Sequence, residues 1–244
     1  MDWSSSDLAV VRSCWNYFER EEEFRNWIIH VAGATRLWNP AELMLRTIHK
    51  SYLGDLEKCG IPIVPTAFIY RCQPQSLRAA LETTRWTQFV VKPAVSAASY
   101  KTRRFATGQL QEAQKFLDDI LLERDAMVQR FLPRVAEGGE IDLNYIDGEL
   151  THGVVKHPRF KDDLESVSEA FQPTNEQRAV ANRVMATVHE PWLYGRVDLM
   201  QTDEGQWVLS ELELIEPSLF LLQHPPALDR FVRALVRLSR RSVF

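Results

Sequence analysis

The chain has 244 residues, of which 45% are hydrophobic and 25% charged, so it can bury a core as one large domain or two small ones. Its 29 Lys and Arg against 33 Asp and Glu give a formal net charge of −4, which argues against a nucleic-acid or an anionic-membrane partner. No apolar run reaches the roughly 20 residues that a membrane span requires, and three cysteines outside any Cys-x-x-Cys pair predict reduced thiols and a cytoplasmic location.

The N-terminal region predicts one short strand followed by one helix. Residues 7–15 (DLAVVRSCW) have the composition of a buried strand, and apolar residues recur at helical spacing over 24–31. No complete βαβ unit precedes this strand, so the chain is predicted to begin within an α/β unit. We therefore interpret residues 1–66 as the remnant of a shortened N-terminal α/β domain.

A longer helix is predicted to start at Asn39-Pro40, because Asn is a good N-cap and Pro is favoured in the first turn. It should run to about Cys59 and stop at Gly60. Lys50 lies off the apolar stripe of this helix, a position where most lysines are simply solvated. A short strand at 61–65 (IPIVP) follows.

The next region, 67–126, is predicted to be a small α+β subdomain. Its segment 87–93 (TQFVVKP) reads as a buried strand that ends in Lys92, whose ammonium must reach solvent or find an anion. The polar stretch 96–105 (SAASYKTRRF) combines small residues with three cations, which suits a loop that folds over phosphates. Basic surface loops are common, however, and this one contains no glycine. An amphipathic helix is predicted over 107–124.

Residues 127–244 are predicted to form a larger α+β subdomain. Asp147-Gly148 is a strong turn signal between two strand-like segments, the second of which closes at Lys156. Residues 157–173 show no period and are predicted to be a loop. Thr174 and Gln177 form a capping box for a helix, and a final amphipathic helix is predicted over 227–241.

A second hairpin is predicted over 192–214, where two strand-like arms flank the turn residues TDEG. Three carboxylates on one face of such a hairpin would repel one another unless a cation lay between them, and Mg²⁺ takes oxygen ligands. The alternative is a solvated polar face, and a shift of one residue in register would remove the argument. With a two-residue turn centred on Glu204-Gly205, the pairs placed opposite one another on this face are Asp198 with Glu211 and Arg196 with Glu213.

Taken in this order, the motifs resemble the ATP-grasp superfamily, in particular its glutathione-synthetase branch and cycloserine-synthetase-like ligases. The resemblance runs from about residue 39 to the end, and it implies an α/β (α+β) fold in which two α+β subdomains clasp a nucleotide. The matching segments are Lys50, VVKP at 90–93, the small-residue loop, MVQRFLP at 127–133, the Asp-Gly hairpin, RVDLM at 196–200 and ELELIEPSLF at 211–220.

The resemblance also implies a role for each matching residue. Lys50 and Lys92 hold the phosphates of ATP, with Ser96 in the covering loop. Glu140, or alternatively Glu137, binds the ribose hydroxyls. Arg196 and Lys156 are the candidate catalytic residues, with Arg196 near the transferred phosphate. The hinge around adenine comprises Gln129, Arg130, Phe131 and Leu132, and the ligands for Mg²⁺ (or Mn²⁺) are Asp198, Glu211 and Glu213.

The implied function is an ADP-forming carboxylate-amine ligase, which makes an amide or a cyclic amide through an acyl phosphate. Its partners would be small-molecule carboxylate and amine substrates, and a homodimer is left open. Two departures favour an alternative, a nucleotide-binding homologue that has lost ligation: residues 157–173 lack the glycines and the arginine of a substrate loop, and the N-terminal domain is short. A structural α/β module without a ligand is a third interpretation, but it leaves Lys92 and the acidic face unexplained.

Overall fold

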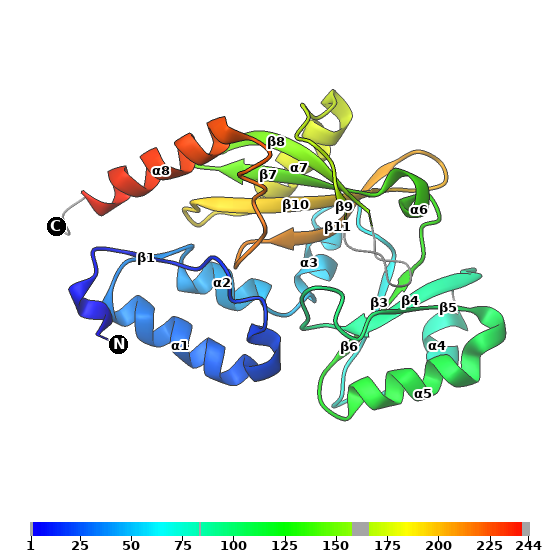
Figure 1. Ribbon diagram of the computed structural model, residues 1–244. Coiled ribbons are helices and arrows are strands. Elements are labelled where there is room, and N and C mark those ends of the chain that lie inside the picture. Colours follow the sequence, from blue (N-terminus) through cyan, green and yellow to red (C-terminus); the bar gives the residue numbers. More distant parts are fainter. Residues whose placement is uncertain (1, 83, 158–165, 241–244) are drawn as a thin grey trace.

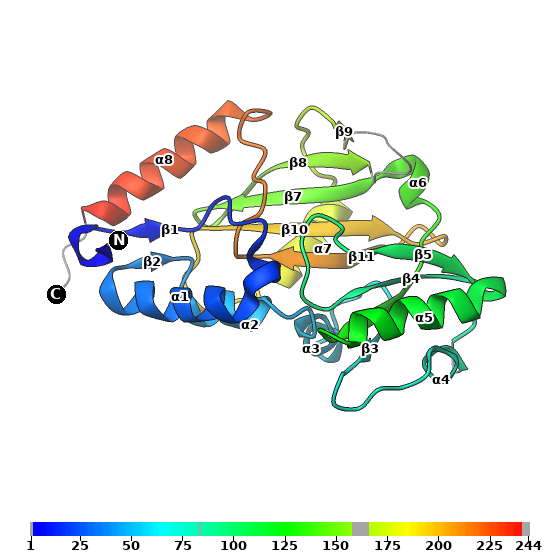
Figure 2. The ribbon, with the colours of Figure 1, turned by 60° about the horizontal axis from the view of Figure 1, so that its bottom comes forward.

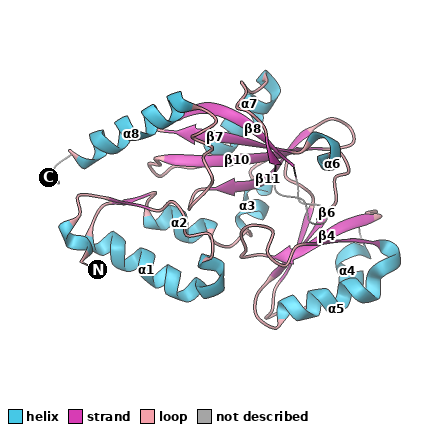
Figure 3. Ribbon diagram, viewed as in Figure 1, coloured by secondary structure: helices cyan, strands magenta, loops and turns pink. Residues whose placement is uncertain are grey.

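Two antiparallel sheets and a small parallel strand pair form the framework of the molecule (Figures 1 and 2). The computed structural model describes residues 2–82, 84–157 and 166–240. Helices pack against both sheets, as Figure 3 shows, so the predicted α+β fold class is confirmed. All three cysteines carry free thiols. None of the helices in the described ranges is long and apolar enough to span a membrane.

The N-terminal unit is a complete βαβ arrangement rather than the middle of one. Strands β1 (Ala9–Val10) and β2 (Leu37–Trp38) pair in parallel, and α1 (Glu21–Ala34) connects them. The predicted strand at 7–15 is thus only two residues long, while the predicted helix is confirmed. Buried residues of this unit form one apolar cluster that also includes Ile215 from the other end of the chain.

The helix predicted from Asn39 to Cys59 is in fact two helices, α2 (Ala41–Thr47) and α3 (Tyr52–Lys58). The break occurs because the Lys50 N–H donates to the Ala94 carbonyl at 2.8 Å and not to the preceding helical turn. Lys50 therefore lies in the turn between the helices. The Asn39 side chain does not cap α2 but bonds to the backbone around Tyr194 and Leu214.

The small sheet has the strand order β3-β6-β4-β5, and α4 (Leu77–Glu82) and α5 (Leu110–Leu121) belong to the same subdomain. Apolar residues on one face of the sheet share a core with both helices. The segment predicted as a strand at 61–65 makes only one bridge, from Ile63 to Leu209. The strands are β3 (Thr66–Ile69), β4 (Gln88–Pro93), β5 (Arg103–Ala106) and β6 (Ala126–Arg130).

Strand β6 lies in the centre of the small sheet, between β3 and β4. The predicted boundary between the two subdomains, at residues 126–127, would assign most of this strand to the large subdomain. The order of the segments along the chain does not reveal which strands pair, so the sequence could not place β6 in the small sheet.

The large sheet has the order β11-β10-β7-β8-β9, with every pair antiparallel. Both predicted hairpins are confirmed. The stretch predicted as a loop contains β9, which pairs with the end of β8; the rest of that prediction, residues 158–165, lies outside the described residues. The strands are β7 (Glu140–Ile146), β8 (Glu149–His157), β9 (Ser166–Val167), β10 (Tyr194–Gln201) and β11 (Trp207–Glu213).

In its own part of the chain the large sheet is accompanied by α6 (Val135–Gly138), α7 (Asn175–Met185) and α8 (Pro225–Ser239). The predicted capping box of α7 is confirmed, with both Thr174–Gln177 hydrogen bonds present. Apolar residues of α7 and α3 pack with β7, β10 and β11 in the largest core cluster, and α8 packs on Ile146 and Tyr194. One face of the central strands is therefore covered by apolar contacts, which leaves the other face for polar residues.

Candidate active site

The register predicted for the β10–β11 hairpin is confirmed where it matters. Asp198 pairs with Glu211, and Arg196 pairs with Glu213. The turn, however, is not the predicted two-residue one, because Gln201 already pairs with Trp207. A bulge between the Asp198 and Leu199 pairs, at Ser210, then shifts the register by one residue and restores the predicted pairing. The sequence thus gives the right partners although the turn and the bulge were both missed.

Strand β7 adds charged residues to the same face, which the sequence analysis did not include. Asp142 lies opposite Asp198, and Asn144 lies opposite Arg196. Asp142 and Asn144 are fully buried, and the side-chain oxygens of Asp142 accept no hydrogen bond within the described residues. The alternation EIDLN at 140–144 was a signal for this face, but it did not reveal which strand β7 would pair with.

Arg196 is the centre of the buried ion pairs. Its Nε and Nη2 donate to the two oxygens of Asp198 at 2.7 and 2.8 Å, and Nη2 also donates to Glu213 Oε1 at 2.5 Å. Its Nε lies 3.4 Å from Asp142 Oδ2. Burial, with the charges of Asp198 and Glu211 as further causes, raises the pKa of Glu213 to about 7 even though Arg196 opposes the shift. Arg196 therefore separates Asp198 from Glu213 and holds both.

The two predicted phosphate-binding lysines meet at one carboxylate. Lys92 Nζ donates to Glu211 Oε1 at 2.9 Å, and Lys50 Nζ lies 3.4 Å from Glu211 Oε2. Burial would raise the pKa of Glu211, but the lysine ammonium groups outweigh it and lower that pKa strongly. Since Lys92 comes from the small sheet and Glu211 from the large one, this contact joins the two subdomains. Two cations thus stand at the edge of the acidic face.

Lys156 lies at the other side of this face. Its Nζ is 2.8 Å from Glu140 and 3.2 Å from Asp142. Glu137, the alternative to Glu140 in the sequence analysis, is exposed on α6 and lies away from these contacts. Burial raises the pKa of Asp142 well above its usual range, and the neighbouring cations only partly oppose this. Of the two predicted ribose-binding acids, only Glu140 therefore belongs to the charged face.

The acidic face has the chemistry of a site for a hard divalent cation, because its donors are carboxylate oxygens on adjacent strands. Among the described residues, however, the acids whose oxygens lie within 4.8 Å of one another are Glu140, Asp142 and Asp198. The predicted set of Asp198, Glu211 and Glu213 shares the face but is held apart by Arg196 and the two lysines. The buried carboxylate of Asp142, without a hydrogen bond, adds a further oxygen donor to the face.

The predicted hinge spans the end of β6, with Gln129 and Arg130 in the strand and Phe131 and Leu132 after it. The N–H groups of Arg130 and Phe131 already donate to the carbonyls of Pro65 and Gln88, at 2.9 and 3.1 Å. Leu132 packs with three apolar residues of the hairpin and of the segment before β3. The Gln129 side chain bonds to Thr66, so it serves the small sheet.

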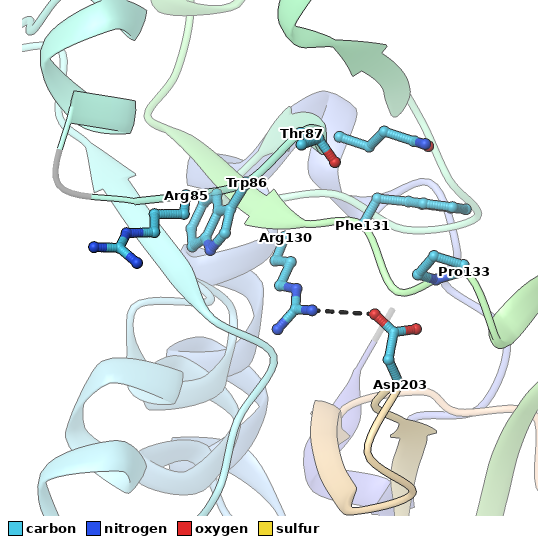
Figure 4. Close-up of a pocket in the computed structure, with 8 residues that line it drawn as sticks. Arg85, Trp86, Thr87, Arg130, Phe131, Pro133 and Asp203 are labelled. Atoms are coloured by element: carbon cyan, nitrogen blue, oxygen red, sulfur yellow. Dashed lines mark hydrogen bonds and ion pairs between the residues drawn. The ribbon is translucent and has the colours of Figure 1, made fainter.

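A cavity of about 350 Å³ opens beside this hinge, as Figure 4 shows. Arg130 crosses it and pairs with Asp203, at the tip of the β10–β11 hairpin, at 3.1 Å. Its walls combine aromatic rings with charged groups, and its lining residues are Arg85, Trp86, Thr87, Gln88, Arg130, Phe131, Pro133 and Asp203.

The loop before β5 is strained and tied to its surroundings. Ala98, Ser99 and Lys101 have positive φ angles of 49°, 57° and 45°, which non-glycine residues rarely adopt. Ser96 is buried, and its carbonyl accepts a hydrogen bond from Lys50 Nζ at 2.7 Å. This loop contains no glycine, and its non-glycine residues therefore adopt positive φ angles next to Lys50, a predicted phosphate-binding lysine.

Comparison with known proteins finds relatives that match nearly the whole chain. Residues 1–39 match a family model described as the N-terminal domain of D-cycloserine synthetase DcsG. The cycloserine biosynthesis protein DcsG of Streptomyces lavendulae is 30% identical over 96% of this chain and 84% of its own length. A crystal structure of D-cycloserine synthetase DcsG superposes with a TM-score of 0.87 and 30% identity, over 98% of this chain and 86% of that one.

More distant structures share the fold. D-alanyl-alanine synthetase A from Vibrio cholerae superposes with a TM-score of 0.69 and 16% identity, over 96% of this chain and 75% of that one. The ATP-grasp ligase PsnB, in a complex with a minimal precursor, Mg and ADP, gives a TM-score of 0.63 and 16% identity, over 96% of this chain and 78% of that one. The arrangement of sheets is therefore shared with D-alanyl-alanine synthetase A and with the ATP-grasp ligase PsnB.

Proposed function

Because the chain belongs to the ATP-grasp ligases, in the family of the cycloserine synthetase DcsG, we propose that it activates an amino-acid carboxylate and closes it into a cyclic amide. ATP and Mg²⁺ are the ligands of this superfamily. At this level the chain is an ATP-dependent, ADP-forming carbon–nitrogen ligase. The ring closure and the use of Mn²⁺ in place of Mg²⁺ are the finer parts of the proposal.

The observation that supports this function most is the meeting of Lys50 and Lys92 at Glu211, beside the buried Arg196–Asp198 pair. We assign both ammonium groups to the phosphates of ATP. We assign Asp198, Glu211 and Glu213 as the ligands of the metal ion, which supplies positive charge to the phosphoryl oxygens. Arg196 and Lys156 are our assignments for the cations that would stabilise the charge on the transferred phosphoryl group.

The hinge assignments can be sharpened from the backbone contacts. Since Arg130 and Phe131 use their N–H groups within the sheet, we propose the N–H of Leu132 as the donor to adenine. Glu140, on the charged face, is our assignment for the ribose hydroxyls in preference to the exposed Glu137. Ser96 then presents the loop that covers the phosphates.

The proposed reaction balances in two steps. A carboxylate oxygen of the substrate attacks the γ-phosphorus of ATP, which forms an acyl phosphate and releases ADP. A nitrogen of the same substrate then attacks the carbonyl carbon, forms the amide bond, loses a proton and expels inorganic phosphate. The residues of this chain hold the reactants in line and stabilise the negative charge that moves between phosphoryl oxygens.

The experiment uses O-amino-serine, the molecule obtained when the ring amide of cycloserine is opened. In the presence of ATP and Mg²⁺ we expect ADP release that depends on this acid, and a hydroxamate when hydroxylamine traps the acyl phosphate from a poor cyclisation substrate such as alanine. Both enantiomers are compared. Nucleotide binding without ADP release across a panel of amino acids would instead favour the homologue that has lost ligation.

A further inference from the structure

Glu216 lies just beyond the end of β11, in the loop that leads to α8. The residue is only 7% exposed, and its carboxylate makes no hydrogen bond or ion pair within the described parts of the chain. Burial, with the negative charge of Glu213 as the next cause, raises the pKa of this carboxyl to about 8. An ionised carboxylate without a partner is costly in such a place, so a cation that reached it would be bound favourably.

The backbone around Glu216 is firmly held, so its unpaired side chain does not result from a loose loop. Four successive carbonyls of this loop accept side-chain hydrogen bonds, two of them from the N-terminal unit, which lies beside the loop in Figures 1 and 2. The contacts are Tyr194 Oη to Ile215 O (2.7 Å), Trp15 Nε1 to Glu216 O (3.2 Å), Arg12 Nη2 to Pro217 O (3.1 Å) and Arg196 Nη1 to Ser218 O (3.3 Å).

Arg12, Arg196 and Lys50 act on Glu216 through their charges, but none of them forms an ion pair with it within the described residues, and Arg12 Nη1 is itself buried without a hydrogen bond. Arg12 donates to Pro217 O, and its guanidinium lies over the Tyr194 and Phe231 rings. Arg196 is held by Asp198 and Glu213. Lys50 is held by Ser96 O and Glu211. These groups lower the pKa of Glu216 only through their electric field, so none of them takes the place of a bound cation.

A second polar group, the Tyr17 hydroxyl of the N-terminal unit, belongs to the apolar cluster that packs on the neighbour of Glu216, Ile215. Tyr17 is 8% exposed, and its hydroxyl makes no hydrogen bond within the described residues. Its ring stacks on Phe24, with centroids 5.0 Å apart, and belongs to the same apolar cluster as Ile215. Burial and then the charge of Glu216 are the main causes that raise the pKa of the Tyr17 hydroxyl.

We infer that Glu216 and the Tyr17 hydroxyl bind a positively charged ammonium group of the carboxylate substrate. The inference rests on the proposed ligase function, because the substrate carboxylate beside Lys50 and Arg196 is what brings the ammonium to this place. A carboxylate and a phenol oxygen suit the three N–H donors of an ammonium, whereas a divalent metal ion requires about six oxygen ligands. The N-terminal unit and the loop after β11 thus select amino acids over simple carboxylic acids.

The test compares two probes that differ only in the ammonium group: O-amino-serine, in its D and L forms, and 3-(aminooxy)propanoic acid. Their binding to the full-length protein is measured by calorimetry, with and without Mg²⁺ and a non-hydrolysable ATP analogue. We expect the wild type to bind one form of O-amino-serine about 30-fold more tightly, as charge-assisted hydrogen bonds predict. Glu216→Gln should remove most of this preference, and Tyr17→Phe a smaller part of it.

The control is Glu57→Gln, the same change at an exposed glutamate on α3, which should leave the preference intact. The inference is overturned if the wild type does not prefer O-amino-serine, or if Glu216→Gln weakens both probes equally. The ligase proposal fails separately. Selective binding of O-amino-serine without ADP release would reject the ligase function and keep the ammonium site. ADP release with equal efficiency on both acids would keep the ligase function and reject the ammonium site.

Discussion

The two ends of the β10–β11 hairpin place the same kind of ion pair in opposite surroundings. At one end the side chains of Arg196 and Asp198 are 5% and 2% exposed, and further acids and lysines surround them. At the other end Arg130 and Asp203 are 32% and 47% exposed and face a cavity (Figure 4). Buried pairs depend strongly on each partner, whereas exposed pairs contribute little. The hairpin thus holds a dense set of charges at its buried end and a single solvated link between the subdomains at its exposed end.

The largest expected effect is at the buried end, from Asp198→Asn. This change keeps the shape of the side chain but removes a proposed metal ligand and the charge that holds Arg196. We expect the kcat/KM for substrate-dependent ADP release to fall about 1,000-fold, comparable to the loss of a main electrostatic contact in other active sites. The matched control is Asp203→Asn at the hairpin tip. Its kcat/KM for ADP release should stay within about twofold of the wild-type value, because an exposed ion pair contributes little. An equal loss of kcat/KM in the two variants would contradict the distinction between the buried and the exposed end of the hairpin.

The next effect is expected from Lys92→Gln, which removes the cation that joins the small sheet to Glu211. The rate of ADP release should fall about 100-fold, with a higher KM for ATP, because one of two ammonium groups at the phosphates is lost. Steady-state kinetics at several ATP concentrations measure both parameters. Lys58→Gln, at an exposed lysine on α3, serves as the control. A change in KM for the amino acid alone would contradict the assignment of Lys92 to the nucleotide.

Much of the buried end could be predicted from the sequence, because it depends on local patterns. Alternation within one hairpin places Asp198 opposite Glu211. The position of Lys92, at the end of an apolar strand, indicates that its ammonium group needs an anion. The partners that sequence reasoning missed come from pairing between distant segments. Asp142 reaches the face because β7 pairs with β10, and Glu216 lies in a loop whose carbonyls are bonded by the N-terminal unit and by β10.

Other misses have the same origin. The helix over 39–59 was predicted from good local signals, but a hydrogen bond from Lys50 N–H to Ala94 breaks it, and this contact depends on the small sheet. The ion pair at the exposed end of the hairpin was likewise not predicted. Nothing in the sequence around Arg130 indicates that it lies beside Asp203, 73 residues further along the chain. Tertiary contacts, rather than propensity, decide these positions.

The third prediction tests the cost of an unpaired buried acid through pH. The folded pKa of Glu216, about 8, lies above its ordinary value of 4.5, so the folded state binds the proton more tightly than the unfolded state does. The wild type should therefore lose stability as pH rises from about 4.5 to about 8, and Glu216→Gln should not show this loss. The free energy of unfolding of the variant, relative to that of the wild type, should rise by about 2 kcal/mol between pH 5 and pH 9. This rise is smaller than the full pKa difference implies, because the site can relax when the carboxyl ionises.

Urea unfolding at the two pH values measures this difference. Glu57→Gln should unfold with the same pH dependence as the wild type, since it changes an exposed glutamate without a buried charge. A variant that is equally destabilised at both pH values would show that Glu216 has a partner in solution, and would weaken the ammonium site as well.

The smallest effect is expected at the exposed end, from a double-mutant cycle on Arg130 and Asp203. Each change to Ala, and the two together, should give a coupling energy of about 0.2–1 kcal/mol in urea unfolding, because both side chains are partly solvated. Raising the salt concentration to about 1 M shortens the screening length to about 3 Å and should reduce the coupling further. ATP affinity should change little in all three variants, because Leu132, and not the Arg130 side chain, is assigned to the base. A coupling above about 2 kcal/mol would mean that this pair holds the two subdomains together as firmly as the buried pairs do.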